Sequence, residues 1–141
     1  MKNLIKVSFL FALMFLLSCS SNDEAIILDP ADNSKSVADC GEAFVSPERN
    51  YFCLGGAPEV LPGEILNYAF KHNSINTDVT WSIESGEMEI LNIETSVSGD
   101  FTISIATIKF DSDFDGGFLK ASSIPNENKG EGFVLTEINP E

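Results

Sequence analysis

The sequence contains few of the side chains on which most enzymes rely. Its 141 residues include one histidine, His72, three cysteines and one tryptophan. A serine or cysteine nucleophile needs a neighbouring base, usually histidine, and a third group that orients the base. No such arrangement is indicated, so we expect a protein that is not an enzyme; a small hydrolase is the catalytic alternative. His72 itself is expected at the surface, at the end of a strand.

Basic side chains are also scarce. Eight Lys and Arg stand against 22 Asp and Glu, and the formal net charge is -14 at pH 7. Phosphate backbones are bound by clustered positive charge, so we expect no nucleic-acid partner. Strong acidity instead keeps a surface protein soluble and favours cations or basic partners.

The main apolar run lies at the N-terminus and is too short to span a membrane. Residues 1–6 carry Lys2 and Lys6 and no acid, and residues 7–17 are almost wholly apolar. A transmembrane helix needs about 20 apolar residues. This order of charged and apolar regions predicts a secretory signal peptide over residues 1–18, with an uncleaved membrane helix as the alternative.

The signal region ends in Leu16-Leu17-Ser18-Cys19, which resembles the lipobox of bacterial lipoproteins. The resemblance implies cleavage between Ser18 and Cys19 and acylation of Cys19, which would bind the mature chain to a membrane. Two or three acyl chains hold a protein durably, because each buried methylene contributes about 0.8 kcal/mol. The alternative is ordinary signal cleavage that leaves a free thiol.

The residues after Cys19 bear on the destination of the protein. Position 20 is Ser20 and not Asp, so the usual inner-membrane retention signal of many Gram-negative bacteria is absent, and we expect an outer-membrane lipoprotein. The acids Asp23-Glu24 resemble an export signal of surface lipoproteins, or else they begin a solvated tether. The polar composition of residues 19–39 predicts a flexible tether, in which residues 26–28 could alternatively form an edge strand.

Two cysteines remain once Cys19 is assigned to lipid. Cys40 and Cys53 are separated by 12 residues. An even pair in an exported protein predicts a disulfide, with metal binding by the two thiols as the weaker alternative. Closing a loop of this size should stabilise the fold by about 3 kcal/mol.

From Cys40 onward the pattern is one of strands and turns. No stretch sustains the 3.6-residue apolar period of a helix, whereas several segments alternate apolar and polar residues. The clearest inward-facing sets are Leu66, Tyr68 and Phe70, then Val79, Trp81 and Ile83, and then Met88 and Ile90. We therefore expect an all-β domain.

The segment 101–110 carries two apolar sets of opposite parity. A one-residue change of register turns every side chain to the other face of a sheet. We expect a bulge or break near Ala106 that lets both sets face inward. The two sets are Phe101, Ile103 and Ile105, and then Ile108 and Phe110.

Six or seven short strands over about 100 residues fit a β-sandwich with Trp81 at its centre. Three segments resemble the PKD-like group of immunoglobulin-like domains, which place a core tryptophan in one strand, a sharp glycine turn after it, and a later strand that ends in Phe before a Gly-rich turn. These segments are Val79-Thr80-Trp81-Ser82-Ile83-Glu84-Ser85-Gly86, Ala106-Thr107-Ile108-Lys109-Phe110 and Gly116-Gly117-Phe118-Leu119-Lys120-Ala121-Ser122. The resemblance covers residues 79–138 and implies an immunoglobulin-like β-sandwich of about seven strands over residues 40–141.

One acidic turn matches the first half of a calcium loop. Asp111, Asp113 and Asp115 alternate before Gly116-Gly117, and alternate carboxylates on a glycine turn can converge on Ca²⁺. The acid expected at the twelfth loop position is Ser122, so the second half of the motif is missing. No cofactor is required; calcium is the candidate metal, and a plain turn between two strands is the alternative.

These observations predict a lipid-anchored, non-enzymatic surface module that binds a protein or a glycan through its loops. The alternative is a carbohydrate-binding accessory lipoprotein of a glycan-uptake system. Its aromatic platform would come from Tyr51, Tyr68, Phe114 and Phe118, of which only Phe114, inside the acidic turn, is expected to be exposed. A contiguous exposed aromatic patch on one sheet face would favour the glycan, and a bare acidic face would favour a protein.

Overall fold

The computed structural model describes residues 29–41, 51–75, 77–125 and 132–141. The predicted signal peptide, Cys19 and the first ten residues of the expected tether lie outside these ranges. Within them the one helical element is a 3₁₀ turn, η1 (Pro30–Asp32). No helix among the described residues is long and apolar enough to cross a membrane.

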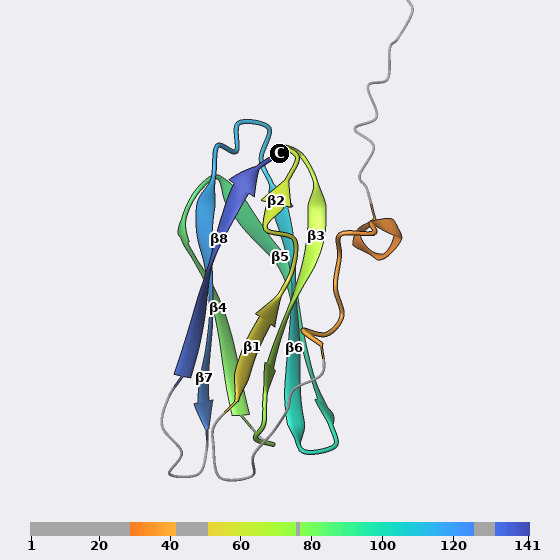
Figure 1. Ribbon diagram of the computed structural model, residues 1–141, viewed down its shortest axis with the longest axis vertical. Coiled ribbons are helices and arrows are strands. Elements are labelled where there is room, and N and C mark those ends of the chain that lie inside the picture. Colours follow the sequence, from red (N-terminus) through yellow and green to blue (C-terminus); the bar gives the residue numbers. More distant parts are fainter. Residues whose placement is uncertain (1–28, 42–50, 76, 126–131) are drawn as a thin grey trace, which may run out of the picture.

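Eight strands of the described chain form two four-stranded sheets that pack face to face (Figure 1). One sheet has the order β1-β3-β6-β5, with strands β1 (Phe52–Gly55), β3 (Ile65–His72), β6 (Phe101–Phe110) and β5 (Met88–Ser98). The other has the order β2-β8-β7-β4, with strands β2 (Glu59–Val60), β8 (Gly132–Pro140), β7 (Gly117–Pro125) and β4 (Thr77–Ser85). Neighbouring strands are antiparallel except β2 and β8, which are parallel. The all-β prediction is confirmed, in an immunoglobulin-like sandwich.

Trp81 joins the two sheets at the centre of the core, as its position in the sequence predicts. The side chain is buried, and its ring meets that of Phe70 edge-on with the centroids 6.5 Å apart. The indole N–H donates a hydrogen bond to the hydroxyl oxygen of Ser104 at 3.0 Å. Trp81 lies on β4 whereas Phe70 and Ser104 belong to the facing sheet, so one side chain contributes both apolar and polar contacts across the sandwich.

Strand β6 differs from the sequence prediction. It is continuous, and its even-numbered residues face the core throughout, so Phe101, Ile103 and Ile105 point outward and no break occurs at Ala106. Two polar residues take the inward places because both find partners there. Thr102 donates to the carbonyl of Ser74 at 2.6 Å, and Ser104 accepts from Trp81. The inward residues are Thr102, Ser104, Ala106, Ile108 and Phe110.

The bulge lies instead in the neighbouring strand. The register of β5 against β6 shifts between Ile90 and Asn92, so Leu91 is the extra residue. Beyond it, β5 continues as a regular strand to Ser98, through a polar stretch that the sequence pattern did not mark as a strand. A bulge of this kind changes which residues of the bulged strand face inward and leaves the partner strand intact.

Residues 33–41, which we call the N-terminal strap, lie along the edge of β3. The backbone N–H of Val37 donates to the carbonyl of Asn67 at 3.0 Å, and the Asn67 N–H donates to the Ser36 hydroxyl at 3.0 Å. The ammonium of Lys71 lies 2.9 Å from a carboxylate oxygen of Asp39. The sequence predicted a flexible tether up to residue 39. In the structure, the last residues of this segment are instead bound to the sandwich.

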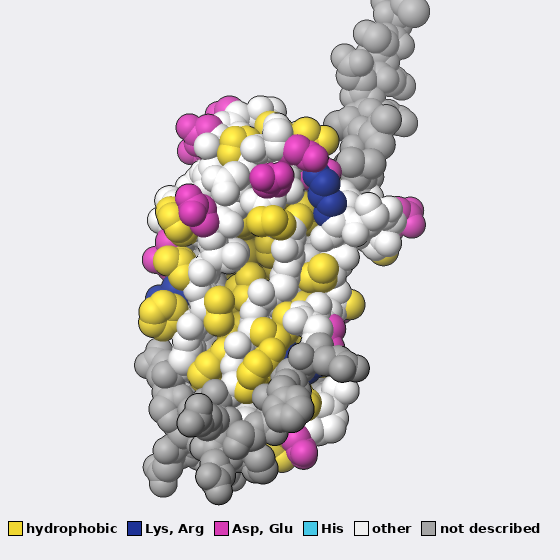
Figure 2. Space-filling model, viewed as in Figure 1, with side chains coloured by type: hydrophobic (Ala, Val, Ile, Leu, Met, Phe, Trp, Pro, Cys, Tyr) yellow, Lys and Arg dark blue, Asp and Glu magenta, His cyan; other side chains and the backbone are white. Residues whose placement is uncertain are grey.

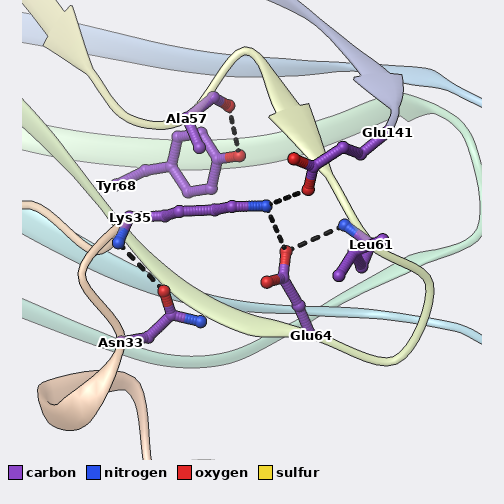
Figure 3. A network of polar contacts seen from close by, with 7 residues as sticks. All are labelled: Asn33, Lys35, Ala57, Leu61, Glu64, Tyr68 and Glu141. Atoms are coloured by element: carbon purple, nitrogen blue, oxygen red, sulfur yellow. Dashed lines mark hydrogen bonds and ion pairs between the residues drawn. The ribbon is translucent and has the colours of Figure 1, made fainter.

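The start of the strap is held at the end of the sandwich where the chain terminates (Figure 3). The ammonium of Lys35 lies 3.3 Å from the Glu64 carboxylate and also contacts Glu141. The second Lys35 contact is with the last residue of the chain. These two carboxylates, Glu141 above all, raise the pKa of Lys35 above its ordinary value, although burial opposes them. The Glu64 carboxylate also accepts from the N–H of Leu61 at 2.8 Å.

Cys40, at the end of the strap, forms a disulfide with Cys53 on β1, which confirms the predicted pairing. The two Cα atoms are 6.0 Å apart. Cys53 pairs with Lys71 in the β-ladder, and Lys71 holds Asp39, so a covalent bond and an ion pair fix the same end of the strap.

Removal of the disulfide is expected to destabilise the domain. The double variant Cys40→Ser/Cys53→Ser should lose about 3 kcal/mol of unfolding free energy, because the unfolded chain regains the freedom of the closed loop. Urea denaturation followed by tryptophan fluorescence measures this. The control Ser36→Ala removes one strap hydrogen bond and should cost only about 1 kcal/mol. Equal midpoints for the double variant and the wild type would show that the disulfide does not stabilise the fold.

Tyr68 places a hydroxyl group inside the core (Figure 3). Its O–H donates to the carbonyl of Ala57 at 2.8 Å, and the residue is buried. Gly56 makes room for the ring, since a Cβ at that position would lie 2.0 Å from a ring carbon. Burial first, and the nearby Glu64 carboxylate second, raise the pKa of Tyr68 well above its ordinary value.

Tyr68→Phe is expected to have two separable effects. At neutral pH it should lower the free energy of unfolding by about 1 to 3 kcal/mol, because the buried Ala57 carbonyl loses its donor. Because the pKa of Tyr68 is higher in the folded than in the unfolded chain, the tyrosine stabilises the folded state fully only below its unfolded pKa of about 10. This contribution is lost as the pH rises from that value towards the folded pKa. The variant should therefore lose less stability than the wild type between pH 9 and 11. Urea titrations across that range test both effects, with Tyr51→Phe as control; parallel pH profiles for wild type and Tyr68→Phe would contradict the second.

Candidate binding surface

The acidic turn of the predicted calcium site connects β6 to β7. Asp111 donates its backbone N–H to the Glu87 carbonyl at 3.0 Å, and its carboxylate lies 3.4 Å from the ammonium of Lys109. Among the described residues, no group of three or more His, Cys, Asp or Glu side chains is placed to hold a metal ion. Asp111, Asp113 and Asp115 form no such group here, and calcium binding by this turn stays a prediction.

Phe114, which the sequence predicted to be exposed in this turn, is buried. Only 3% of it is exposed, and its ring packs edge-on against that of Phe110 with the centroids 4.9 Å apart. A hydrogen bond from the Phe114 N–H to the Asp111 carbonyl, at 3.1 Å, closes the turn and directs the ring inward. Tyr68 is also buried and Tyr51 is half-buried. The fourth predicted platform residue, Phe118, is exposed although only Phe114 was expected to be, so the platform of four residues does not form.

His72 is buried too, although a surface position was expected. Its ring stacks on that of Phe52 with the centroids 4.4 Å apart. The two residues pair in the ladder between β1 and β3. The prediction was wrong because the short strand β1, which the pattern did not reveal, covers this end of β3.

The exposed apolar surface lies elsewhere, on the outer face of the second sheet. Strand β7 buries Leu119 and Ala121, so its other set of side chains points outward. On β8 the residue with the largest exposure is Phe133, at 63%. We call the outward apolar residues of these two strands the β7–β8 strip; they are Phe118, Ile124, Phe133 and Leu135.

The ladder between β7 and β8 makes the strip continuous. Leu135 on β8 pairs with Lys120 on β7. Phe118 lies two residues from Lys120 along β7, and Phe133 lies two residues from Leu135 along β8. Same-face neighbours at that diagonal spacing lie about 7 to 8 Å apart, within reach of aromatic side chains. The ammonium of Lys120 lies 5.0 Å from the centroid of the Phe133 ring. One cation is thus held within the apolar surface by a cation–π contact.

Acidic side chains border the strip. Asp78 pairs with Ile124 at one end, and Glu137 pairs with Phe118 at the other; both acids are exposed. On β4 the exposed Glu84 adds a third carboxylate, which accepts a hydrogen bond from Ser82 at 2.6 Å. The surface is therefore an apolar strip with one central positive charge and a negative margin.

A second apolar region lies where β1 and β8 approach each other. Figure 2 shows hydrophobic side chains along the middle of the visible face and acidic ones most densely towards the end where the chain terminates. Phe52, Leu54 and Val134 are partly buried there and pack against the core. Gly132 allows this packing, because a Cβ on it would lie 2.2 Å from the Phe52 ring. These side chains close the sandwich, whereas those of the β7–β8 strip lie on its outside.

Comparisons with protein-family models, with curated proteins and with solved structures find no significant match to this chain. The lipobox and PKD-like resemblances therefore stay predictions.

Proposed function

We propose that this protein is a lipid-anchored lipoprotein of the outer membrane or cell surface that binds a partner rather than catalyses a reaction. The observation that carries the proposal is the β7–β8 strip, with Phe133 as its most exposed residue. Contiguous apolar side chains on a soluble surface are costly to hydrate and mark sites of interaction. The motif Leu16-Leu17-Ser18-Cys19 supports the anchor.

The partner that best fits the strip is a protein surface with an apolar centre and Lys or Arg at its margin. Leu135 lies between the two aromatic rings and Ile124 lies beyond Phe133, and aliphatic side chains favour protein over sugar. The acidic margin, with Asp78 and Glu137 at the two ends, complements basic residues and steers their approach. The net charge of the chain, -14, acts in the same direction.

One observation favours the glycan alternative. Phe118 and Phe133 place two exposed aromatic rings on one sheet face, with Lys120 and Ser122 as hydrogen-bonding groups beside them. Apolar stacking with a few polar groups is also how sugar sites are built. The two hypotheses differ in the role of the aliphatic residues Ile124 and Leu135. A protein partner would contact them, whereas a sugar needs only the two rings.

The predicted anchor would hold the sandwich close to its membrane. The strap contacts the sandwich from Lys35 onward, so the part of the chain between the predicted anchor and the sandwich ends before that residue. Nine residues lie between Cys19 and Asp29, and a fully extended chain over these ten Cα–Cα steps reaches about 35 Å.

Cys19→Ser is expected to release the protein from the membrane, because serine offers no thiol for acylation. In a Gram-negative host, the wild type should incorporate radiolabelled palmitate and sediment with outer-membrane vesicles, and the variant should do neither. Ser20→Ala is the control and should behave as the wild type. Equal labelling of wild type and Cys19→Ser would overturn the anchor, and digestion by protease added to intact cells would identify the outward-facing orientation.

Substitutions in the β7–β8 strip are expected to remove partner binding without loss of stability. A photo-crosslinking amino acid at position 133 of the anchored chain should form a protein adduct in cells. Leu135→Ser in the same chain should reduce its yield at least tenfold, since burial of a leucine contributes about 1.5 to 3 kcal/mol. Higher salt should also reduce the yield, because the margin is charged.

Leu61→Ser is the matched control, because Leu61 and Leu135 are both 48% exposed and Leu61 lies outside the strip. It should leave the adduct unchanged. An adduct at position 133 that is indifferent to Leu135→Ser would contradict the protein hypothesis. Retention on immobilised polysaccharide that Phe133→Ala abolishes and Leu135→Ser preserves would support the glycan alternative instead.

A further inference from the structure

Strand β5 is an edge strand whose inward face is left open. Within the described residues it pairs only with β6, along its whole length. Thr95 faces the core, because its hydroxyl donates to that of Ser104 at 3.0 Å. Ile93 and Val97 pair with the buried residues Ala106 and Thr102, so they share this inward face.

Both side chains nevertheless remain accessible to solvent. Ile93 is 44% exposed and Val97 is 57% exposed. Apolar residues on the inward face of a sandwich are normally covered, and here the sheet that faces them ends at β4. An additional strand beside β5 would cover them and supply partners for its outer backbone groups.

The usual protections of an edge strand are few in this part of β5. Natural edges are blunted by lysine, proline, bulges or inward-pointing charges. The bulge at Leu91 precedes the regular part of the strand, Asn92–Ser98, which contains no lysine, proline or inward charge. Its one charged residue, Glu94, pairs with the outward-facing Ile105 and so points outward.

We propose that two copies of this protein associate through antiparallel pairing of their β5 strands, about a two-fold axis at Thr95. Thr95 is the midpoint of Asn92–Ser98, and this register uses the whole regular segment. It places apolar residues opposite apolar residues and each carboxylate opposite a hydroxyl. The pairs are Asn92 with Ser98, Ile93 with Val97, Glu94 with Ser96, and Thr95 with Thr95.

Neighbouring registers are less favourable. An axis at Glu94 would place two carboxylates opposite each other, which is destabilising. An axis at Ile93 would run into the bulge at Leu91. An axis at Ser96 places Asn92 and Ile93 opposite residues beyond the end of β5, and an axis at Val97 leaves most of the segment unpaired. The symmetry of the sequence about Thr95 therefore selects a second copy as the occupant, in the isologous manner of most dimers.

The N-terminal segment of the same chain fits this edge less well. The strap lies beside β3, and β6 separates β3 from β5. A foreign strand would have no reason to match the two-fold pattern.

The net charge sets the conditions for association. Each chain carries -14, so two copies repel each other at low ionic strength. Salt screens this repulsion, and the Debye length falls from about 10 Å at 0.1 M to about 3 Å at 1 M. We expect the dimer to strengthen with salt, in contrast to partner binding at the β7–β8 strip.

Cysteine cross-linking tests the register. The exported chain with Cys19→Ser carries no lipid and, apart from the disulfide pair, no thiol. Residues directly opposite in an antiparallel ladder have Cβ atoms about 4.5 to 5.5 Å apart, so Thr95→Cys should oxidise to a covalent dimer. Glu94→Cys and Ser96→Cys should each stay monomeric, whereas the double variant E94C/S96C should cross-link.

Charge on the open face tests the association itself. Sedimentation equilibrium of the same Cys19→Ser chain should show the average mass approach twice that of one chain at high concentration and 0.5 M salt. Val97→Lys should remain monomeric, and it should fold, since the position is more than half exposed. Leu61→Lys is the control and should dimerise as the parent chain does.

A single-chain mass at every concentration and salt would overturn the proposal. So would a dimer that survives Val97→Lys, or cross-linking by Ser96→Cys in place of Thr95→Cys. A dimer that is lost on Leu135→Ser would place the interface on the β7–β8 strip. That result would overturn pairing through β5, whereas the other results leave partner binding at the strip, which is measured separately, unaffected.

Discussion

The hydrogen bond from the indole of Trp81 to Ser104 is the interaction on which the arrangement of this sandwich depends. It agrees with the inward position of the even-numbered residues of β6, although over residues 101–105 the odd-numbered ones are more apolar. Paired residues share a face, so the same choice sets the faces of β3 and β5. Ser104 also accepts from Thr95, which orients the open side of β5. The parity of β6 that satisfies this contact, and that also buries Ile108 and Phe110, therefore decides which apolar residues are covered and which are left exposed.

The sequence predicts most of the strands but only part of their register. Alternation in β3 and β4 correctly places Leu66, Tyr68 and Trp81 in the core. It fails in β6 because apolar character cannot show that Thr102 and Ser104 find hydrogen-bond partners in the folded chain. Strands β1 and β2 have four and two residues, too few to show a period.

The candidate surface was harder to predict than the fold. Phe133, Val134 and Leu135 form an unbroken apolar run, which leaves open which of them face outward. The residue that settles the direction comes later in the strand. Ile138 is buried, and because side chains alternate between the two faces, Val134 shares its inward face whereas Phe133 points outward. Phe114 was expected to be exposed because its neighbours in the turn are polar, and the sequence does not show that its ring packs on Phe110. The cysteine pairing needed no such knowledge, because two thiols left in a chain predicted to be exported have one partner each.

The strap determines how the molecule would respond to a pulling force at its N-terminus. A pull on the N-terminus would first strain the contacts of Lys35 and the two hydrogen bonds at Asn67, which yield one after another. Peeling would then stop at Cys40, where the load passes through a covalent bond into β1 and from there into the backbone ladder with β3. Under tension the predicted tether would lengthen by the residues of the strap that precede Cys40. The sandwich beyond the disulfide would then bear the force as a unit.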